Sequence, residues 1–200
     1  MKLIKSIMAG IFIGLSSFVF LSVGSYFGAV LFTFGLICIV LLKLDLFTNV
    51  AGSTRVFPVN IFPGDLRKLG FVLFGNMIGT LLVSFLFLTR PDLNESVRII
   101  LQDRLNCSCG DAILKGLGCG FIMEAVFSIY KKTDNKLAIL FGIPIFIILG
   151  FYHCITDSFY IFSYLLTSFY IPLKILLVYI LTILGNFLGC IISNKLIEWS

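Results

Sequence analysis

Charged side chains are scarce in this chain. Asp, Glu, Lys and Arg make up 12% of its 200 residues, whereas a soluble domain carries about 25%. Hydrophobic residues account for 59%. This composition excludes a soluble globular protein and predicts an all-α protein that crosses a lipid bilayer several times. The net charge of +5 does not indicate a nucleic-acid partner.

Histidine is nearly absent, since the chain has one, and its six cysteines are dispersed. With no nucleotide-binding loop, no catalytic triad and no cluster at metal-ligand spacing, we predict neither an enzyme nor a resident cofactor or metal. Cys107 and Cys109 form a single Cys-x-Cys in a loop. A metal or redox role for them stays open, although zinc sites usually contain two such pairs.

The chain also lacks the features of a cleaved signal peptide. After Lys2 and Lys5, Ile7–Leu42 runs for 36 residues without a charge, which is too long for a signal sequence, and no small-residue cleavage site stands out. We therefore predict a first membrane helix that turns directly into a second.

Apolar residues form six segments. They are approximately Ile4–Tyr26, Gly28–Leu44, Leu69–Thr89, Ala112–Tyr130, Leu137–Tyr152 and Pro172–Leu196. A spanning helix needs about 20 apolar residues, so the second and fifth segments are too short. Each is followed by a stretch rich in Gly, Ser, Thr and Asn or Asp. We predict that both helices break within the membrane and that their unwound backbone lines a cavity.

Short motifs recur between the two halves of the chain. The pairs are Gly75-Asn76-Met77-Ile78-Gly79 with Gly185-Asn186-Phe187-Leu188-Gly189, 110 residues apart, Gly10 and Gly14 with Gly116 and Gly120, 106 apart, and Thr48 with His153, 105 apart. These similar offsets predict a single domain over 1–200. It contains two inverted three-helix repeats, about 4–89 and 112–200, joined by an outer loop, 90–111.

The basic residues of the loops predict the orientation. With both termini in the cytoplasm, nine Lys and Arg lie on the inner side and four on the outer side, as the positive-inside rule requires. The expected location is the plasma (inner) membrane. The outer loop is predicted to carry a short surface helix around Glu95–Leu105.

His153 and Thr48 are the candidate pore residues. His153 follows 16 residues without a charge, and ionisable groups at membrane depth usually line a pathway. A helix cap at Thr48 and a satisfied buried His153 are the simpler alternatives for each residue alone. At matched breaks, we predict instead that the two face each other at mid-pore. The imidazole would exchange a proton with a small anion near physiological pH.

Other residues of the breaks receive supporting roles. Asn76 and Asn186 are predicted to bond the exposed backbone of the two breaks, because a buried amide needs partners. Asp157, one turn after His153, could favour the imidazolium form. The predicted apolar constrictions are formed by Phe32, Leu36, Leu46, Phe47 and Phe146. Lys115 and Glu124 are charges within a span, which we expect to face a pore, a vestibule or another subunit.

Taken in order, these motifs resemble the formate/nitrite transporter family over nearly the whole chain. The motifs are Ala9-Gly10 with Gly14, Phe32–Asn49, the two Gly-Asn-x-x-Gly motifs and Gly150-Phe151-x-His153. The resemblance implies six helices in an aquaporin-like fold, with helices two and five broken, and a homopentamer with one pore per subunit. It implies transport of small weak-acid anions such as formate, nitrite, hydrosulfide or lactate, often with a proton. The family's pore histidine and loop threonine fall on His153 and Thr48, and its constriction on the five apolar residues named above.

The sequence departs from the family pattern around the predicted pore. Tyr152 replaces a glutamate, Thr156-Asp157 replace Ala-Asn, and Glu124 stands where the family has an asparagine. A basic residue is missing near Ser108, for which Lys115 could compensate. The extra carboxyl groups keep one alternative open, a neutral or cationic solute such as ammonia. A second alternative is a non-transporting membrane scaffold, although a scaffold has no need of unwound backbone at membrane depth.

Overall fold

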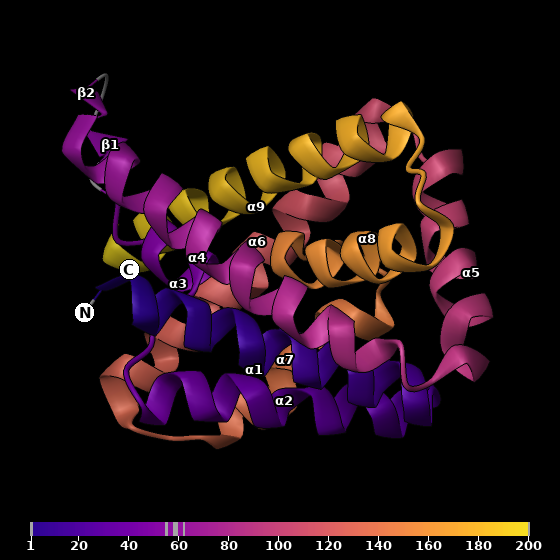
Figure 1. Ribbon diagram of the computed structural model, residues 1–200. Helices are drawn as coiled ribbons and strands as arrows, with labels where there is room; N and C mark the ends of the chain where they lie inside the picture. The colour runs from indigo at the N-terminus through magenta and orange to yellow at the C-terminus, as the bar shows by residue number, and fades with distance from the viewer. Residues whose placement is uncertain (1, 55, 58–59, 62, 200) are drawn as a thin grey trace.

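The computed structural model describes residues 2–54, 56–57, 60–61 and 63–199, and nearly all of them are helical (Figure 1). Within this part of the chain, four helices are long and apolar enough to cross a membrane. They are α1 (Lys2–Val23), α4 (Pro63–Phe87), α6 (Cys109–Thr133) and α9 (Leu173–Trp199). The prediction of an all-helical chain with several membrane spans is therefore confirmed.

The second and fifth apolar segments form shorter helices, as predicted. They are α2 (Ser25–Leu41) and α7 (Leu137–Ile148). After a non-helical stretch, each is followed by another helix, α3 (Phe47–Ala51) or α8 (Cys154–Ser168). The chain therefore unwinds at Leu42–Leu46 and at Leu149–His153, close to where the two breaks were predicted.

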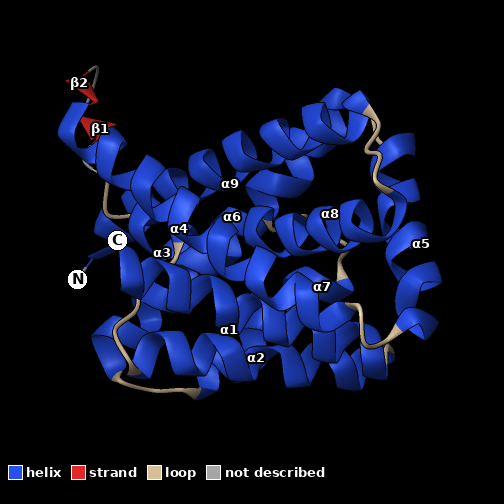
Figure 2. Ribbon diagram, viewed as in Figure 1, coloured by secondary structure: helices blue, strands red, loops and turns tan. Residues whose placement is uncertain are grey.

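The remaining elements lie outside the long helices. A 3₁₀ turn (Pro91–Leu93) leads into α5 (Asn94–Asn106), which confirms the predicted surface helix. Strands β1 (Val56–Phe57) and β2 (Asn60–Ile61) form a small antiparallel hairpin, with Val56 paired to Ile61 (Figure 2). The predicted third segment began too late, at Leu69, because the charged first turn of α4 conceals the start of the helix at Pro63.

The bundle is built from two pairs of closely packed long helices, α1 with α4 and α6 with α9. A Cβ atom at Gly10 would overlap the backbone carbonyl of Asn76, and one at Gly120 would overlap that of Asn186. These two glycines therefore occupy equivalent positions, 110 residues apart. The predicted match of Gly10 with Gly116 was wrong, because short glycine motifs can be aligned in more than one register.

The two ends of the bundle differ. In Figure 1, both chain termini lie at one end, together with the β-hairpin, whereas α5 runs across the opposite end. The second break, between α7 and α8, opens toward the α5 end, where the candidate site lies.

Candidate transport site

Both broken helices end in the same backbone motif. Lys43 after α2 and Gly150 after α7 have positive φ angles, 52° and 68°. In each case the next residue donates a backbone hydrogen bond to the carbonyl five residues earlier, as in a Schellman cap. These bonds are Leu44 N to Ile39 O and Phe151 N to Phe146 O, each 2.9 Å long.

The first break is held by Asn76 on α4. Its Nδ2 donates to the carbonyls of Ser6 (2.7 Å) and Asp45 (2.9 Å), and its Oδ1 accepts from the N–H of Phe47 (2.8 Å). One buried amide thus satisfies backbone groups of α1, of the unwound segment and of the start of α3. An unwound backbone needs such partners when no water is available.

Asn186 on α9 holds the second break in the same way. Its Nδ2 donates to the carbonyls of Gly116 and Tyr152, both at 2.8 Å, and its Oδ1 accepts from the N–H of Cys154 (2.9 Å). The contacts agree with the support that the sequence predicted for both asparagines.

These shared contacts define which residues of the two breaks correspond. Phe47 and Cys154 give their N–H groups to the two asparagines, so the residues before them, Leu46 and His153, are equivalent. Thr48 is therefore not the counterpart of His153, and the predicted match at 105 residues was wrong by two positions. The sequence offered no marker for the register because the two breaks share few residue types.

His153 caps the first turn of α8. Its Nδ1 accepts the backbone N–H of Thr156 (3.3 Å) and lies 3.2 Å from the Thr156 hydroxyl. Because Nδ1 acts as an acceptor, the neutral ring carries its proton on Nε2. Nε2 is buried and has no hydrogen-bond partner among the described residues. The ring therefore holds a donor that is free for a solute.

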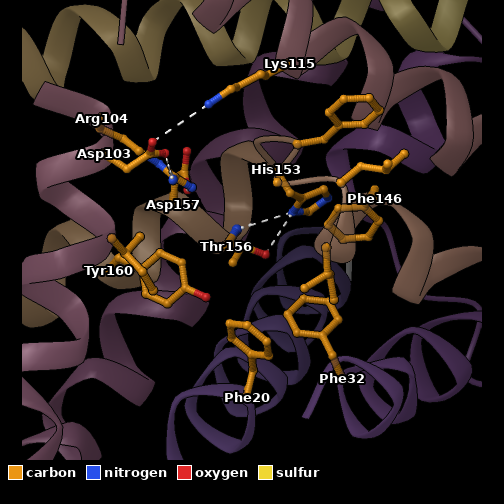
Figure 3. Close-up of a pocket in the computed structure, with 15 residues that line it drawn as sticks. Phe20, Phe32, Asp103, Arg104, Lys115, Phe146, His153, Thr156, Asp157 and Tyr160 are labelled. Carbon is orange, nitrogen blue, oxygen red and sulfur yellow. Dashed lines mark hydrogen bonds and ion pairs between the residues drawn. The ribbon is translucent and has the colours of Figure 1, made fainter. Parts of the chain in front are cut away.

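A cavity of about 360 Å³ lies beside His153, which lines it together with Thr156 (Figure 3). The His153 ring lies beside Phe146, with ring centroids 5.8 Å apart, and Phe146 meets Phe32 edge-on at 6.1 Å. Phe20 also contributes to the cavity wall. This cavity, called the vestibule below, is large enough for a small solute and is lined in part by aromatic rings.

Four charged residues gather in the same cavity. Arg104 on α5 donates to Asp157 on α8 (2.8 Å) and to its neighbour Asp103 (2.9 Å). Lys115 on α6 lies 3.8 Å from Asp103. The Asp157 side chain is 3% exposed, so this is a largely buried ion pair. The vestibule therefore contains two cations and two carboxylates.

Tyr152 links these charges. Its hydroxyl donates to Asp103 (2.6 Å) and accepts from Lys115 Nζ (3.0 Å). Its ring lies 3.8 Å from the Arg104 guanidinium and 4.5 Å from Lys115 Nζ, within the range of cation–π attraction. Tyr152 thus acts as a neutral bridge between Asp103 and the two cations.

The network changes the proton affinity of the α5 residues that form it. Burial disfavours the charge on Asp103, but the Tyr152 hydroxyl and the charges of Arg104 and Lys115 outweigh it and lower its pKa. Burial likewise opposes the charge on Arg104, yet the Asp157 carboxylate raises its pKa above the ordinary value. Both groups therefore stay charged at neutral pH.

Removing the Arg104 charge should destabilise the protein. In Arg104→Met the buried Asp157 carboxylate loses its cation, which typically reduces the free energy of unfolding by about 3 kcal/mol. Thermal unfolding in detergent would measure this. Arg90→Met is the matched control, because the Arg90–Asp92 pair is 44% and 56% exposed and should contribute nothing measurable. Equal stability of the two variants would contradict the assigned role of the buried pair.

Not every predicted pore residue lines this cavity. His153, Phe32, Phe146, Asp157 and Lys115 do. Leu36, Leu46, Phe47 and Thr48 are buried, at 0–2% exposure, but lie outside its lining. The Thr48 hydroxyl has no hydrogen-bond partner within the described part of the chain, so no bond joins it to His153.

Glu124 lies elsewhere, against Ser128 and Asn194. Asp157 bonds Arg104 and not the imidazole, which stays with Thr156.

Sequence reasoning missed Arg104 as a site residue. It stands on α5, in the polar segment between the long helices, where a basic residue is ordinary, and its partner lies 53 positions later in the chain. The signal that could have found it was Asp157 itself, since a carboxyl group in an apolar segment requires a partner.

Comparison with known proteins identifies the family. The model of the formate/nitrite transporter family matches residues 1–200. The chain belongs to the formate/nitrite transporter family. As a member, it is a multi-pass membrane protein of a family of channels and transporters, which confirms the resemblance found in the sequence.

One curated relative is likewise named a transporter. The "Uncharacterized transporter YrhG" of Bacillus subtilis (strain 168) is 29% identical over 154 residues, which is 70% of this chain. The match covers 58% of the length of YrhG.

Two solved structures share the fold. A "Pentameric formate channel with formate bound" has 22% identity and a TM-score of 0.83, covering 99% of this chain and 95% of its own. An "FNT family ion channel" has 18% identity and a TM-score of 0.86, covering 99% and 88%.

Proposed function

We propose that this chain is a channel or proton-coupled transporter for small monovalent weak-acid anions of the formate, nitrite, hydrosulfide or lactate type. The proposal includes a single domain over 1–200 made of two inverted repeats with six membrane-crossing units, two of them broken. The matching three-bond patterns of Asn76 and Asn186 support the two repeats. The likeness to a formate channel supports the cargo class.

The observation that carries the proposal is the buried and unpartnered Nε2–H of His153, a residue that lines the vestibule. A small oxyanion can accept this hydrogen bond while the rings of Phe146 and Phe32 exclude water. An anion that crosses such a constriction pays a large desolvation free energy. The neutral acid avoids most of this penalty.

The predicted proton exchange at His153 has a geometric requirement. An imidazolium ring would need a proton on Nδ1, which would end the hydrogen bond that caps α8. The ring in its capped state is therefore better suited to donating a hydrogen bond than to giving up a proton. We propose that His153 orients the anion and that its protonation, where it occurs, is transient.

The charged network supports capture of an anion at moderate strength. Arg104 and Lys115 supply positive charge to the vestibule, while Asp103 and Asp157 offset it. A vestibule that is neutral overall attracts anions through its local cations without trapping them, which suits a pathway that must release its cargo.

A homopentamer in the plasma membrane with both termini cytoplasmic completes the proposal. Large apolar side chains such as Phe34 and Phe141, 62% and 68% exposed, suit contact with lipid or with another subunit. Both termini lie at the end opposite α5, as this orientation requires (Figure 1). The pentameric state of a solved relative supports the assembly.

The alternative of a neutral or cationic solute such as ammonia rested on Asp157 and Glu124. It loses the support of Asp157, because Arg104 pairs with that carboxylate, and rests on Glu124 alone. A non-transporting scaffold does not account for an unpartnered buried donor on a residue that lines a cavity.

Reconstitution in liposomes tests the proposal. We expect the purified protein to take up at least one of formate, nitrite, hydrosulfide and lactate, and uptake to rise as pH falls because more of the cargo is available as neutral acid. Internal pH and labelled anion would be followed together. Uptake of ammonium alone, or of none of these solutes, would rule the function out.

A further inference from the structure

The vestibule does not explain Glu124, a second buried carboxyl group. Glu124 is 1% exposed and lies nine residues beyond Lys115 on α6, or about 13.5 Å along the helix axis toward the chain termini. Its Oε1 accepts a hydrogen bond from Ser128 (3.0 Å) and lies 3.3 Å from the Asn194 amide. Its Oε2 is buried and has no hydrogen-bond partner among the described residues.

The free oxygen of Glu124 lies against α3. A Cβ atom at Gly52, the residue that ends α3, would overlap the Glu124 carboxyl group. The carboxyl group thus occupies the place of the side chain that Gly52 lacks. Because Thr48 lies four residues before Gly52, it shares that face of the helix, with about 5–6 Å between the two Cβ positions.

Three buried oxygen atoms therefore gather around α3 without partners in the described part of the chain. They are Glu124 Oε2, Thr48 Oγ1 and Asn49 Oδ1. Buried polar atoms are nearly always bonded, and exceptions call for an explanation. A path for a polar solute, continuing from His153 past the first break, provides one.

The other charged groups near Glu124 do not neutralise it. No ion pair within 4 Å joins it to a described residue. The sequences of α3 and α7 contain no charge. The titratable groups on its own helix and on α9 that act on it or lie nearby are Lys131, Cys190, Lys195 and Glu198, of which Lys195 pairs with Glu198.

We propose that Glu124 is a proton-binding site at the α3 end of the pathway, and that an anion passes α3 readily only while this carboxyl group is protonated. The inference rests on the transport function proposed above. Protonated Glu124 is neutral and offers both a donor and an acceptor, much like the asparagine of the family pattern. Ionised Glu124 would repel an anion beside Thr48 across a medium of low dielectric constant.

The test is exchange of labelled formate across liposomes with the same pH on both sides, from pH 5.5 to 8.5. If another anion of the panel is carried better, that anion replaces formate. The comparison is between Glu124→Gln and the unsubstituted protein. Glutamine keeps the shape and the hydrogen bonds but cannot ionise. We expect a flux ratio near one at low pH that rises to about tenfold or more at high pH, because only the unsubstituted protein gains the repelling charge.

Three further variants make the result specific. Glu124→Asp keeps a carboxyl group and should retain the steep pH dependence. Gly52→Ala should push the carboxyl group off α3 and flatten that dependence, and it provides the same test if Glu124→Gln does not assemble. Asp134→Asn changes an exposed carboxyl group at the end of α6 and should give a ratio of one throughout.

The outcomes separate the two proposals. A ratio for Glu124→Gln that rises with pH supports the proton site. A ratio that is constant across pH, at any level of flux, overturns it while the transport function stands. Absence of exchange for every anion of the panel in the unsubstituted protein rejects the transport function, and the proton site with it.

Discussion

Replacing His153 with asparagine should reduce anion uptake in liposomes at least about tenfold without unfolding the protein. Asparagine is a good N-cap, so its side chain can still accept the Thr156 N–H and hold the start of α8. What the variant loses is the Nε2–H donor at the constriction beside Phe146. Loss of one preorganised donor to a developing or passing oxyanion typically lowers a rate by about 10²–10³-fold in enzymes, and a transport constriction should lie near the lower end.

The matched control is Ser108→Asn, which exchanges one N-cap for another at the start of α6. Ser108 is exposed and outside the cavity, so its variant should transport normally. Initial uptake rates at several pH values would be compared at equal amounts of assembled protein. Uptake by the His153 variant within twofold of the unsubstituted protein would contradict the role assigned to the imidazole.

Replacing Asn186 with leucine should have the largest effect on stability. The variant leaves the carbonyl of Tyr152 without a donor and the N–H of Cys154 without an acceptor. The carbonyl of Gly116 loses its second donor and keeps the hydrogen bond within α6. Each buried group left unpaired costs about 1–3 kcal/mol, so for two groups we expect the free energy of unfolding to fall by about 2–6 kcal/mol. Uptake should fall as well, because His153 lies between two of these backbone groups.

Thermal unfolding in detergent, with the fraction of assembled oligomer, measures this effect. Asn76→Leu should behave alike, since Asn76 makes the same three bonds at the first break. Asn106→Leu, on the exposed end of α5, is the control and should unfold near the normal temperature. If the Asn186 variant unfolds with the control, the asparagine does not hold the break.

Much of the fold could be predicted because lipid imposes strict rules on a sequence. Without water to satisfy the backbone, a spanning segment must be a helix of sufficient length, so the short second and fifth segments had to break or end. The same rule predicted the role of Asn76 and Asn186. A buried side-chain amide needs hydrogen-bond partners, and the N–H and C=O groups of an unwound backbone need them too. These inferences used segment length and residue type, which are local properties.

The register between the two halves could not be read in this way. Glycine motifs align at several offsets, and the correct one became clear only from which carbonyl each glycine meets, Asn76 for Gly10 and Asn186 for Gly120. Thr48 and His153 therefore appeared equivalent in the sequence although Leu46 holds the matching position. Contacts between distant segments define equivalence, and no local pattern records them.

The chain alone determined that this is a helical membrane protein with two interrupted helices and a histidine at one of the interruptions. Because few of its side chains are charged, most of its surface must face lipid and not water. The tertiary structure decided what surrounds that histidine. It brings Arg104 on α5 to Asp157, places Tyr152 between two cations, and places Glu124 against α3 instead of in the vestibule. These pairings depend on how separate helices dock, because charges far apart in the chain meet only when packing places their side chains within a few ångströms.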